Sequence, residues 1–206
     1  MIHTLAKKYK EFYQATKPEK PDPCCKTIYQ DFFELSDPQN PENPCAKFKN
    51  TFHHLIKVIH FEGFVSQFKN GTKANQGKRC DFILCDHQGQ TLIFDELTQT
   101  KHKYLSPHKQ EGLLVKGKQQ QALEQLQESV KRLRAVPEIK DHIDMVSHKV
   151  LLFSHRDPDY SEDTIGEGAR KFSMTVSNKE LIKLKESNVK GFETYIQPYP
   201  VPFCLK

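Results

Sequence analysis

Two stretches, Cys80-Asp-Phe-Ile-Leu-Cys85 and Thr91-Leu-Ile-Phe-Asp-Glu-Leu-Thr98, decide how we expect this chain to fold. Each is an apolar run of strand length, and the linker Asp86-His-Gln-Gly-Gln90 between them has the glycine that is typical of a hairpin turn. The two stretches therefore predict a β-hairpin at the centre of the fold.

The segments after this hairpin predict a helix followed by a buried strand. A helix is expected from about Leu114 to Ala135, because one stripe of its surface is formed by Lys116, Gln119, Leu123, Leu126, Val130 and Leu133. Pro137 ends it. The run Lys149-Val-Leu-Leu-Phe-Ser154 is typical of a central parallel strand. The tail predicts a long loop over 156–170, strands near 172–176 and 191–197, and a short helix over 178–187.

The segments before the hairpin are less regular. Residues 1–16 have the spacing of an amphipathic helix, two proline-rich loops surround a short helix expected near 28–35, and a longer buried helix is expected from Asn50 or Thr51 to Phe68. We expect residues 1–45 to form an N-terminal helical and proline-rich arm, and 46–206 to form one α/β domain. The element order predicts a mixed central β-sheet flanked by helices.

Composition narrows the class of protein. The 206 residues carry a formal net charge of +5, and the mean hydropathy is −0.69. The longest apolar runs fall far short of the roughly 20 residues that a membrane span needs. The N-terminus lacks the apolar stretch of a signal peptide, so we expect a cytoplasmic protein without membrane contact. The six cysteines form no Cys-x-x-Cys pair and are expected to be reduced structural thiols.

Acidic residues inside the predicted strands suggest chemistry. Asp81 opens the first strand and Glu96 lies within the second, although strand interiors disfavour acids. Glu62 falls on the buried stripe of the preceding predicted helix. Three converging carboxylates would repel one another without a cation, and Mg²⁺ or Mn²⁺ would take such hard oxygen ligands. The same residues also fit a plainer role, in hydrogen bonds to loop amides and salt bridges to lysine.

This layout resembles the PD-(D/E)XK nucleases, the restriction-endonuclease-like superfamily. The resemblance covers about residues 50–155 and implies that Asp81 and Glu96 are metal ligands, with Glu62 as an auxiliary catalytic acid. Thr98 stands where the family has lysine, and Cys80-Asp81 stands for the usual proline-aspartate pair. Some members place the lysine, or a glutamine, on the neighbouring helix, which makes Lys116 and Gln119 candidate catalytic residues.

Basic residues flank the hairpin on both sides. Lys78, Arg79, Lys101 and Lys103 would form a basic rim around the acidic centre, which suits a phosphodiester substrate. The resemblance and this rim together predict a Mg²⁺- or Mn²⁺-dependent nuclease acting on DNA, as a component of restriction, defence or a mobile element.

Two alternatives stay open. One is a catalytically inactive relative that binds nucleic acid or a protein partner, which Thr98 favours; the other is an interaction module whose carboxylates form only salt bridges. Motifs of serine hydrolases, P-loop enzymes, dinucleotide-binding proteins and zinc proteases are absent from the sequence. The pattern leaves the oligomeric state and the choice between DNA and RNA open.

Overall fold

The computed structural model describes residues 2–14, 24–68, 72–110, 112–159, 180–185, 187 and 189–205. The helices are α1 (Ile2–Phe12), α2 (Phe61–Ser66), α3 (Lys118–Arg134) and α4 (Pro137–Met145). The strands are β1 (Cys25–Ile28), β2 (Phe32–Ser36), β3 (Pro44–Asn50), β4 (Ile56–His60), β5 (Phe82–Asp86), β6 (Thr91–Gln99), β7 (His108–Gln110), β8 (Leu113–Val115), β9 (His148–Arg156), β10 (Ile182–Lys183), β11 (Glu193–Pro198) and β12 (Pro202–Leu205).

The centre of the fold is a mixed β-sheet, as the sequence predicted. In the described residues it has seven strands in the order β1-β4-β5-β6-β9-β11-β10. The predicted hairpin is confirmed, because β5 pairs antiparallel with β6. The apolar run after the helix forms β9, which runs parallel to β6 as expected. A parallel neighbour needs a crossover connection, and α3 and α4 supply it.

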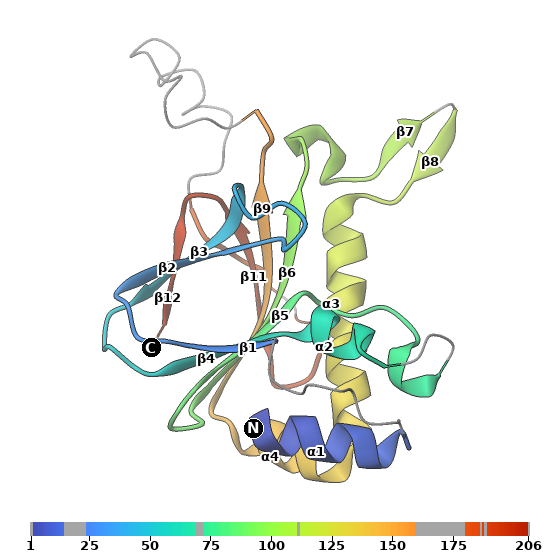
Figure 1. Ribbon diagram of the computed structural model, residues 1–206. Coiled ribbons are helices and arrows are strands. Elements are labelled where there is room, and N and C mark those ends of the chain that lie inside the picture. The colour runs from blue at the N-terminus through green and yellow to red at the C-terminus, as the bar shows by residue number, and fades with distance from the viewer. Residues whose placement is uncertain are drawn as a thin grey trace.

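Different layers cover the two faces of this sheet (Figure 1). On one face, α3 packs along the strands and α1 and α4 lie at its C-terminal end, where Leu126, Val130 and Leu133 join the apolar core around Phe94. The other face carries the three-stranded sheet β12-β3-β2, and Phe48 and Phe203 pack in a second core between the sheets. The fold is therefore an α/β architecture with a helical layer and a β layer.

The helix predicted from Asn50 or Thr51 to Phe68 is wrong. The structure has a turn, the strand β4 and then the six-residue helix α2. Its apolar residues do not share one buried face, because Phe52 and Leu55 are exposed whereas Val58 is buried. Strand β4 is held on both sides, by β1 and by β5, so pairing with distant segments overrides the helical spacing.

Other boundaries differ from expectation. The predicted short helix near 28–35 is wrong, because this region belongs to β1 and β2, and within 178–187 the described part contains the strand β10. Helix α3 begins at Lys118 rather than Leu114, and α4 was not predicted. The expected loop over 160–170 and strand over 172–176 lie outside the described residues.

The first 45 residues contribute α1, β1, β2 and the start of β3, so they supply strands to both sheets. All six cysteines are free thiols, and Cys80 is fully buried. Among the described helices, none combines the length and apolar character needed to span a bilayer.

Candidate functional site

Asp81 and Glu96 lie beside each other where β5 begins. The register pairs Phe82 with Asp95, so the next step along the antiparallel strands brings Asp81 opposite Glu96. By strand alternation Glu96 projects to the same face as Phe94, beneath α3. The structure thus brings together the two acids on which the sequence argument depended.

The backbone holds the Asp81 side chain in place. The amide of Leu97 donates to Asp81 Oδ2 at 2.7 Å, and the Asp81 carbonyl accepts a hydrogen bond from the Phe61 amide at 2.7 Å. Asp81 therefore connects the start of β5 to both β6 and the first turn of α2. This fixes one of its oxygens and its backbone, and Oδ1 is the other oxygen available to a ligand.

Glu96 is held by a residue that the sequence reading missed. Gln125, on the sheet-facing side of α3, donates from Nε2 to Glu96 Oε1 at 2.6 Å and to the Arg79 carbonyl at 3.3 Å. Glu96 is only 7% exposed, and its Oε2 has no hydrogen-bond partner among the described residues. One oxygen of this buried carboxyl is thus oriented and the other is left over.

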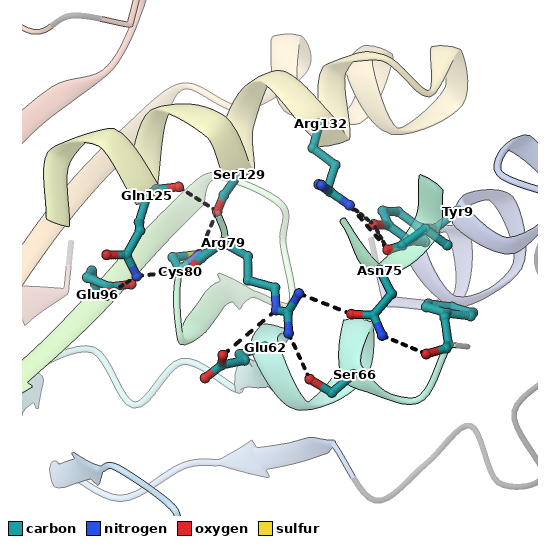
Figure 2. A network of polar contacts seen from close by, with 12 residues as sticks. Tyr9, Glu62, Ser66, Asn75, Arg79, Cys80, Glu96, Gln125, Ser129 and Arg132 are labelled. Atoms are coloured by element: carbon teal, nitrogen blue, oxygen red, sulfur yellow. Dashed lines mark hydrogen bonds and ion pairs between the residues drawn. The ribbon is translucent and has the colours of Figure 1, made fainter. Parts of the chain in front are cut away.

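A second contact fastens α3 to the same place (Figure 2). Ser129 lies one turn after Gln125, donates to the Gln125 carbonyl at 2.8 Å and accepts from the Cys80 amide at 2.7 Å. Cys80 immediately precedes Asp81. The pair Gln125 and Ser129 therefore ties α3 to both acid-bearing strands, which sets the position of the two carboxyl groups.

Both carboxyl groups of the pair have raised pKa values. Burial raises the pKa of Asp81 to about 7, opposed by the hydrogen bond from Leu97. Burial also raises the pKa of Glu96 to about 10, and the negative charges of Asp81 and Asp95 add to the effect. Neither acid forms an ion pair with a basic side chain in the described part of the chain. In the absence of a cation, Glu96 therefore keeps its proton at neutral pH.

The neighbouring acid Asp95 belongs to the other face, as alternation predicted. It is fully buried and accepts from the Ser154 hydroxyl at 2.7 Å, and burial raises its pKa well above the ordinary value. Ser154 also contacts Gln197, whose amide donates to carbonyls on the small-sheet side. This network joins the two layers and is separate from the Asp81–Glu96 pair.

Glu62 lies closer to solvent than expected. It is in the first turn of α2, its side chain is 50% exposed, and Arg79 Nε approaches its Oε1 at 3.8 Å. Arg79 also donates to Ser66 and Asn75, at 3.0 and 3.1 Å (Figure 2). The expectation of a buried helical stripe at Glu62 is therefore wrong, although its charge still raises the pKa of both Asp81 and Glu96.

Lys116 and Gln119 do not share a sheet-facing stripe. Lys116 precedes α3, is exposed, and binds Glu124 Oε1 at 2.7 Å, pointing away from Glu96 to this surface ion pair. Gln119 is half-buried in the first turn of α3, where its amide donates to the Leu105 carbonyl at 3.1 Å. The glutamine that reaches the acids is Gln125, two turns further along.

A metal can be considered on the donor set alone. Among the described residues no group of three or more His, Cys, Asp or Glu side chains has the arrangement of a metal site. Two carboxyl groups do suit Mg²⁺, which commonly takes one or two carboxylates and completes its shell with water and phosphate. The partnerless Oε2 of Glu96 fits such a ligand.

Two clefts adjoin this region on the side of the small sheet. The larger, of about 340 Å³, is bounded by β1, β2, β4 and the start of β5, with His60, Phe82 and Asp37 in its wall. The smaller, of about 90 Å³, shares Asp37 and extends to Leu97 and Thr98. Asp37 also raises the pKa of Asp81, so the clefts lie within electrostatic reach of the acid pair.

The expected basic rim is partly neutralised. Lys78 contacts Glu124, Arg79 contacts Glu62, and Lys101 contacts Asp159 at 2.9 Å. The fourth residue, Lys103, is exposed and places its ammonium 4.9 Å from the centre of the Tyr104 ring. Of the four rim residues, Lys103 alone has no acidic partner within the described part of the chain.

Comparison with known proteins gives no match: no family model, no curated protein and no solved structure is significantly similar to this chain.

Proposed function

We propose that this chain is a metal-dependent nuclease that hydrolyses phosphodiester bonds in DNA, as a divergent relative of the PD-(D/E)XK enzymes. The observation that carries the proposal is the pair of half-buried Asp81 and buried Glu96, opposite each other on neighbouring antiparallel chain segments, without a basic partner among the described residues and with one Glu96 oxygen left over. A divalent cation is the ligand that such a pair of hard oxygen donors suits best.

The element order supports the same proposal. Strands β4, β5 and β6 form an antiparallel meander, α3 crosses over, and β9 returns parallel to β6. The first acid stands at the start of the middle strand and the second inside the next strand. From the hairpin onward this is the element order of the family resemblance, whereas the helix with Glu62 that it placed before the hairpin is here the strand β4 followed by the short helix α2.

The residues divide the work between holding and reacting. Asp81 and Glu96 would hold the cation, which when bound lowers the pKa of water and neutralises charge on a phosphate. Gln125 keeps Glu96 oriented through its 2.6 Å hydrogen bond, and the Leu97 amide does the same for Asp81. Both N–H groups of the Gln125 amide are used, by Glu96 and by the Arg79 carbonyl, so Gln125 is a positioning residue.

Thr98 supports a second candidate function. It replaces the lysine of the family pattern, and Lys116, the candidate substitute just before α3, is engaged with Glu124. Without a positive side chain near the acids, the negative charge that develops in the transition state is stabilised less. A catalytically inactive relative that still binds nucleic acid is therefore the alternative.

The test is cleavage of single- and double-stranded DNA and RNA by the purified chain with Mg²⁺ or Mn²⁺. We expect metal-dependent DNA cleavage that disappears in Asp81→Asn and Glu96→Gln. It should persist in Glu128→Gln, which changes an exposed acid on α3. If the wild-type chain is inactive, Thr98→Lys is the second variant. Activity gained there identifies a decayed site, and inactivity of both forms with no metal binding refutes the proposal.

A further inference from the structure

The connection between β6 and α3 exposes large apolar side chains to solvent. It carries the two-stranded ribbon of β7 and β8, which projects away from the body of the protein beyond the N-terminal end of α3 (Figure 1). Leu113 and Leu114 in this ribbon are 73% and 77% exposed. Gly112 at the turn has a φ of 81°, and nothing lies within 4 Å of the position of a Cβ there. The ribbon is an exposed arm.

The base of this arm is firmly attached. Leu105 is buried against Ala122 and Phe153, and a Cβ at Gly117 would lie 2.2 Å from the Leu105 carbonyl oxygen. The two ends of the connection therefore touch through their backbones, and only glycine fits at that point. A ribbon held so closely at its base keeps its direction relative to α3.

The arm and its base hold much of the charge of the protein. Residues 101–118 contain five lysines and one glutamate, a net charge of +4 against +5 for the whole chain. Lys101 and Lys116 have acidic partners, whereas Lys103, Lys109 and Lys118 are exposed and have none within the described residues. Helix α3 has no acid in its first turn. Its N-terminus normally favours acids, so this end is left electropositive.

The base of the arm lies close to the acid pair along the chain. Gln99 ends β6 three residues after Glu96, and α3 begins seven residues before Gln125. At about 3.3 Å per strand residue and about 1.5 Å per helix residue, each path is about 10 Å long. That distance equals about three base pairs of B-DNA at about 3.4 Å each.

We infer that the β7–β8 ribbon is an arm that enters the major groove of duplex DNA, with Lys103, Lys109 and Lys118 on the phosphates. This inference rests on the proposed function and names how that site would receive its substrate. The B-DNA major groove is about 12 Å wide and admits a two-stranded ribbon, whereas that of duplex RNA is too deep and narrow. Leu113 and Leu114 follow each other in β8 and point to opposite faces of the ribbon, so the one that faces the bases would meet thymine methyl groups, an apolar contact available in that groove.

The experiment measures DNA binding without cleavage, by fluorescence anisotropy of a short duplex in EDTA across a salt series. Lys103→Glu/Lys109→Glu should weaken binding at least about tenfold at low salt and reduce the slope of log K against log salt by about 2, because each lost phosphate contact removes about 0.9. The control Lys7→Glu/Lys185→Glu changes two exposed lysines outside the arm and should stay within about twofold.

The leucines give a separate readout. Leu113→Ser/Leu114→Ser should weaken binding severalfold without changing the salt slope, because no charge is lost. The arm is refuted if the lysine variant and its control bind equally, or if duplex RNA of the same sequence binds as tightly as DNA. It is also refuted if the leucine variant binds DNA normally but converts a dimer of the wild-type chain to monomers, which would make the leucines a protein interface.

Failure of this inference and failure of the proposed function are distinguishable. Arm-dependent binding without metal-dependent cleavage keeps the arm and rejects the nuclease. Metal-dependent cleavage that the arm variant leaves unchanged keeps the nuclease and rejects the arm. All the changed side chains are exposed, so melting temperatures near that of the wild type should accompany every variant.

Discussion

Replacing Glu96 with glutamine should make the metal-free protein more stable while removing cleavage. The folded chain keeps a proton on Glu96 up to a pKa of about 10, whereas the unfolded chain ionises it above about 4.5. Between those values each pH unit therefore favours the unfolded state by about 1.36 kcal/mol. Glutamine does not titrate, and its amide can replace the donor of the protonated acid.

The size of the effect follows from the pH. At pH 7 the difference in unfolding free energy between Glu96→Gln and wild type should approach about 3 kcal/mol, from about 2.5 pH units above the unfolded pKa of 4.5. For a chain of this length that corresponds to an increase in Tm of roughly 6–12 °C. Below about pH 3.5 the difference should vanish, because both states then hold the proton.

The assay is urea and thermal unfolding of both proteins in EDTA at several pH values. Glu124→Gln is the matched control with the opposite sign. Hydrogen bonds from Lys116 and Lys78 hold the pKa of Glu124 at about 2, so its removal should not stabilise the protein at pH 7. A Glu96→Gln variant that is no more stable than wild type at pH 7, or whose advantage is the same at every pH, would refute the reasoning.

The remaining predictions concern metal, positioning and acid stability. Mn²⁺ at about 100 times its Kd should stabilise the wild-type chain by about 2.7 kcal/mol in thermal shift, and Asp81→Asn should lose this gain. Gln125→Ala should reduce cleavage at least tenfold and Gln119→Ala only slightly, and a cleavage assay in which Gln119 matters more would contradict the site geometry. Burial lowers the pKa of His155 to about 4, so the unfolding free energy should fall by up to about 3 kcal/mol from pH 6.5 to 4, and His155→Gln should lack this loss.

The central hairpin could be predicted because its signal is local. Strands β5 and β6 are short, apolar and joined by a glycine-containing turn, and the crossover to β9 leaves few alternatives. The helix predicted for residues 50–68 is wrong because short apolar runs fit helical and strand spacing equally. Its outcome depends on β1, a partner about 30 residues away that nothing in the local pattern identifies. The β-branched residues Ile56, Val58 and Ile59 were the available signal for a strand.

The acid pair and its partner illustrate the same limit. Asp81 and Glu96 could be found because each is an acid in an apolar run, and the hairpin register then brings them together. The sequence pattern points to Gln119 instead of Gln125, because the predicted helix begins at Leu114 and its stripe then includes Lys116, whereas α3 begins at Lys118. Gln125 lies three residues after buried Ala122 and four before buried Ser129, so it shares their face. The sequence contains that spacing, but nothing in it indicates that an acid on a strand lies opposite Gln125.

The acid pair and the arm both carry ionisable groups that lack a partner of opposite charge among the described residues. At the sheet, the half-buried Asp81 and the buried Glu96 have no basic partner among the described residues, which costs stability unless a cation binds. At the arm and its base, three exposed lysines have no acidic partner in the described part of the chain and lie near the electropositive end of α3. Several lysines outside the arm do have acidic partners, as with Lys8 and Glu138 or Lys183 and Glu193. A divalent cation that displaces the proton at the acids, and a phosphate backbone that contacts the lysines, are the two charged partners that this arrangement suits.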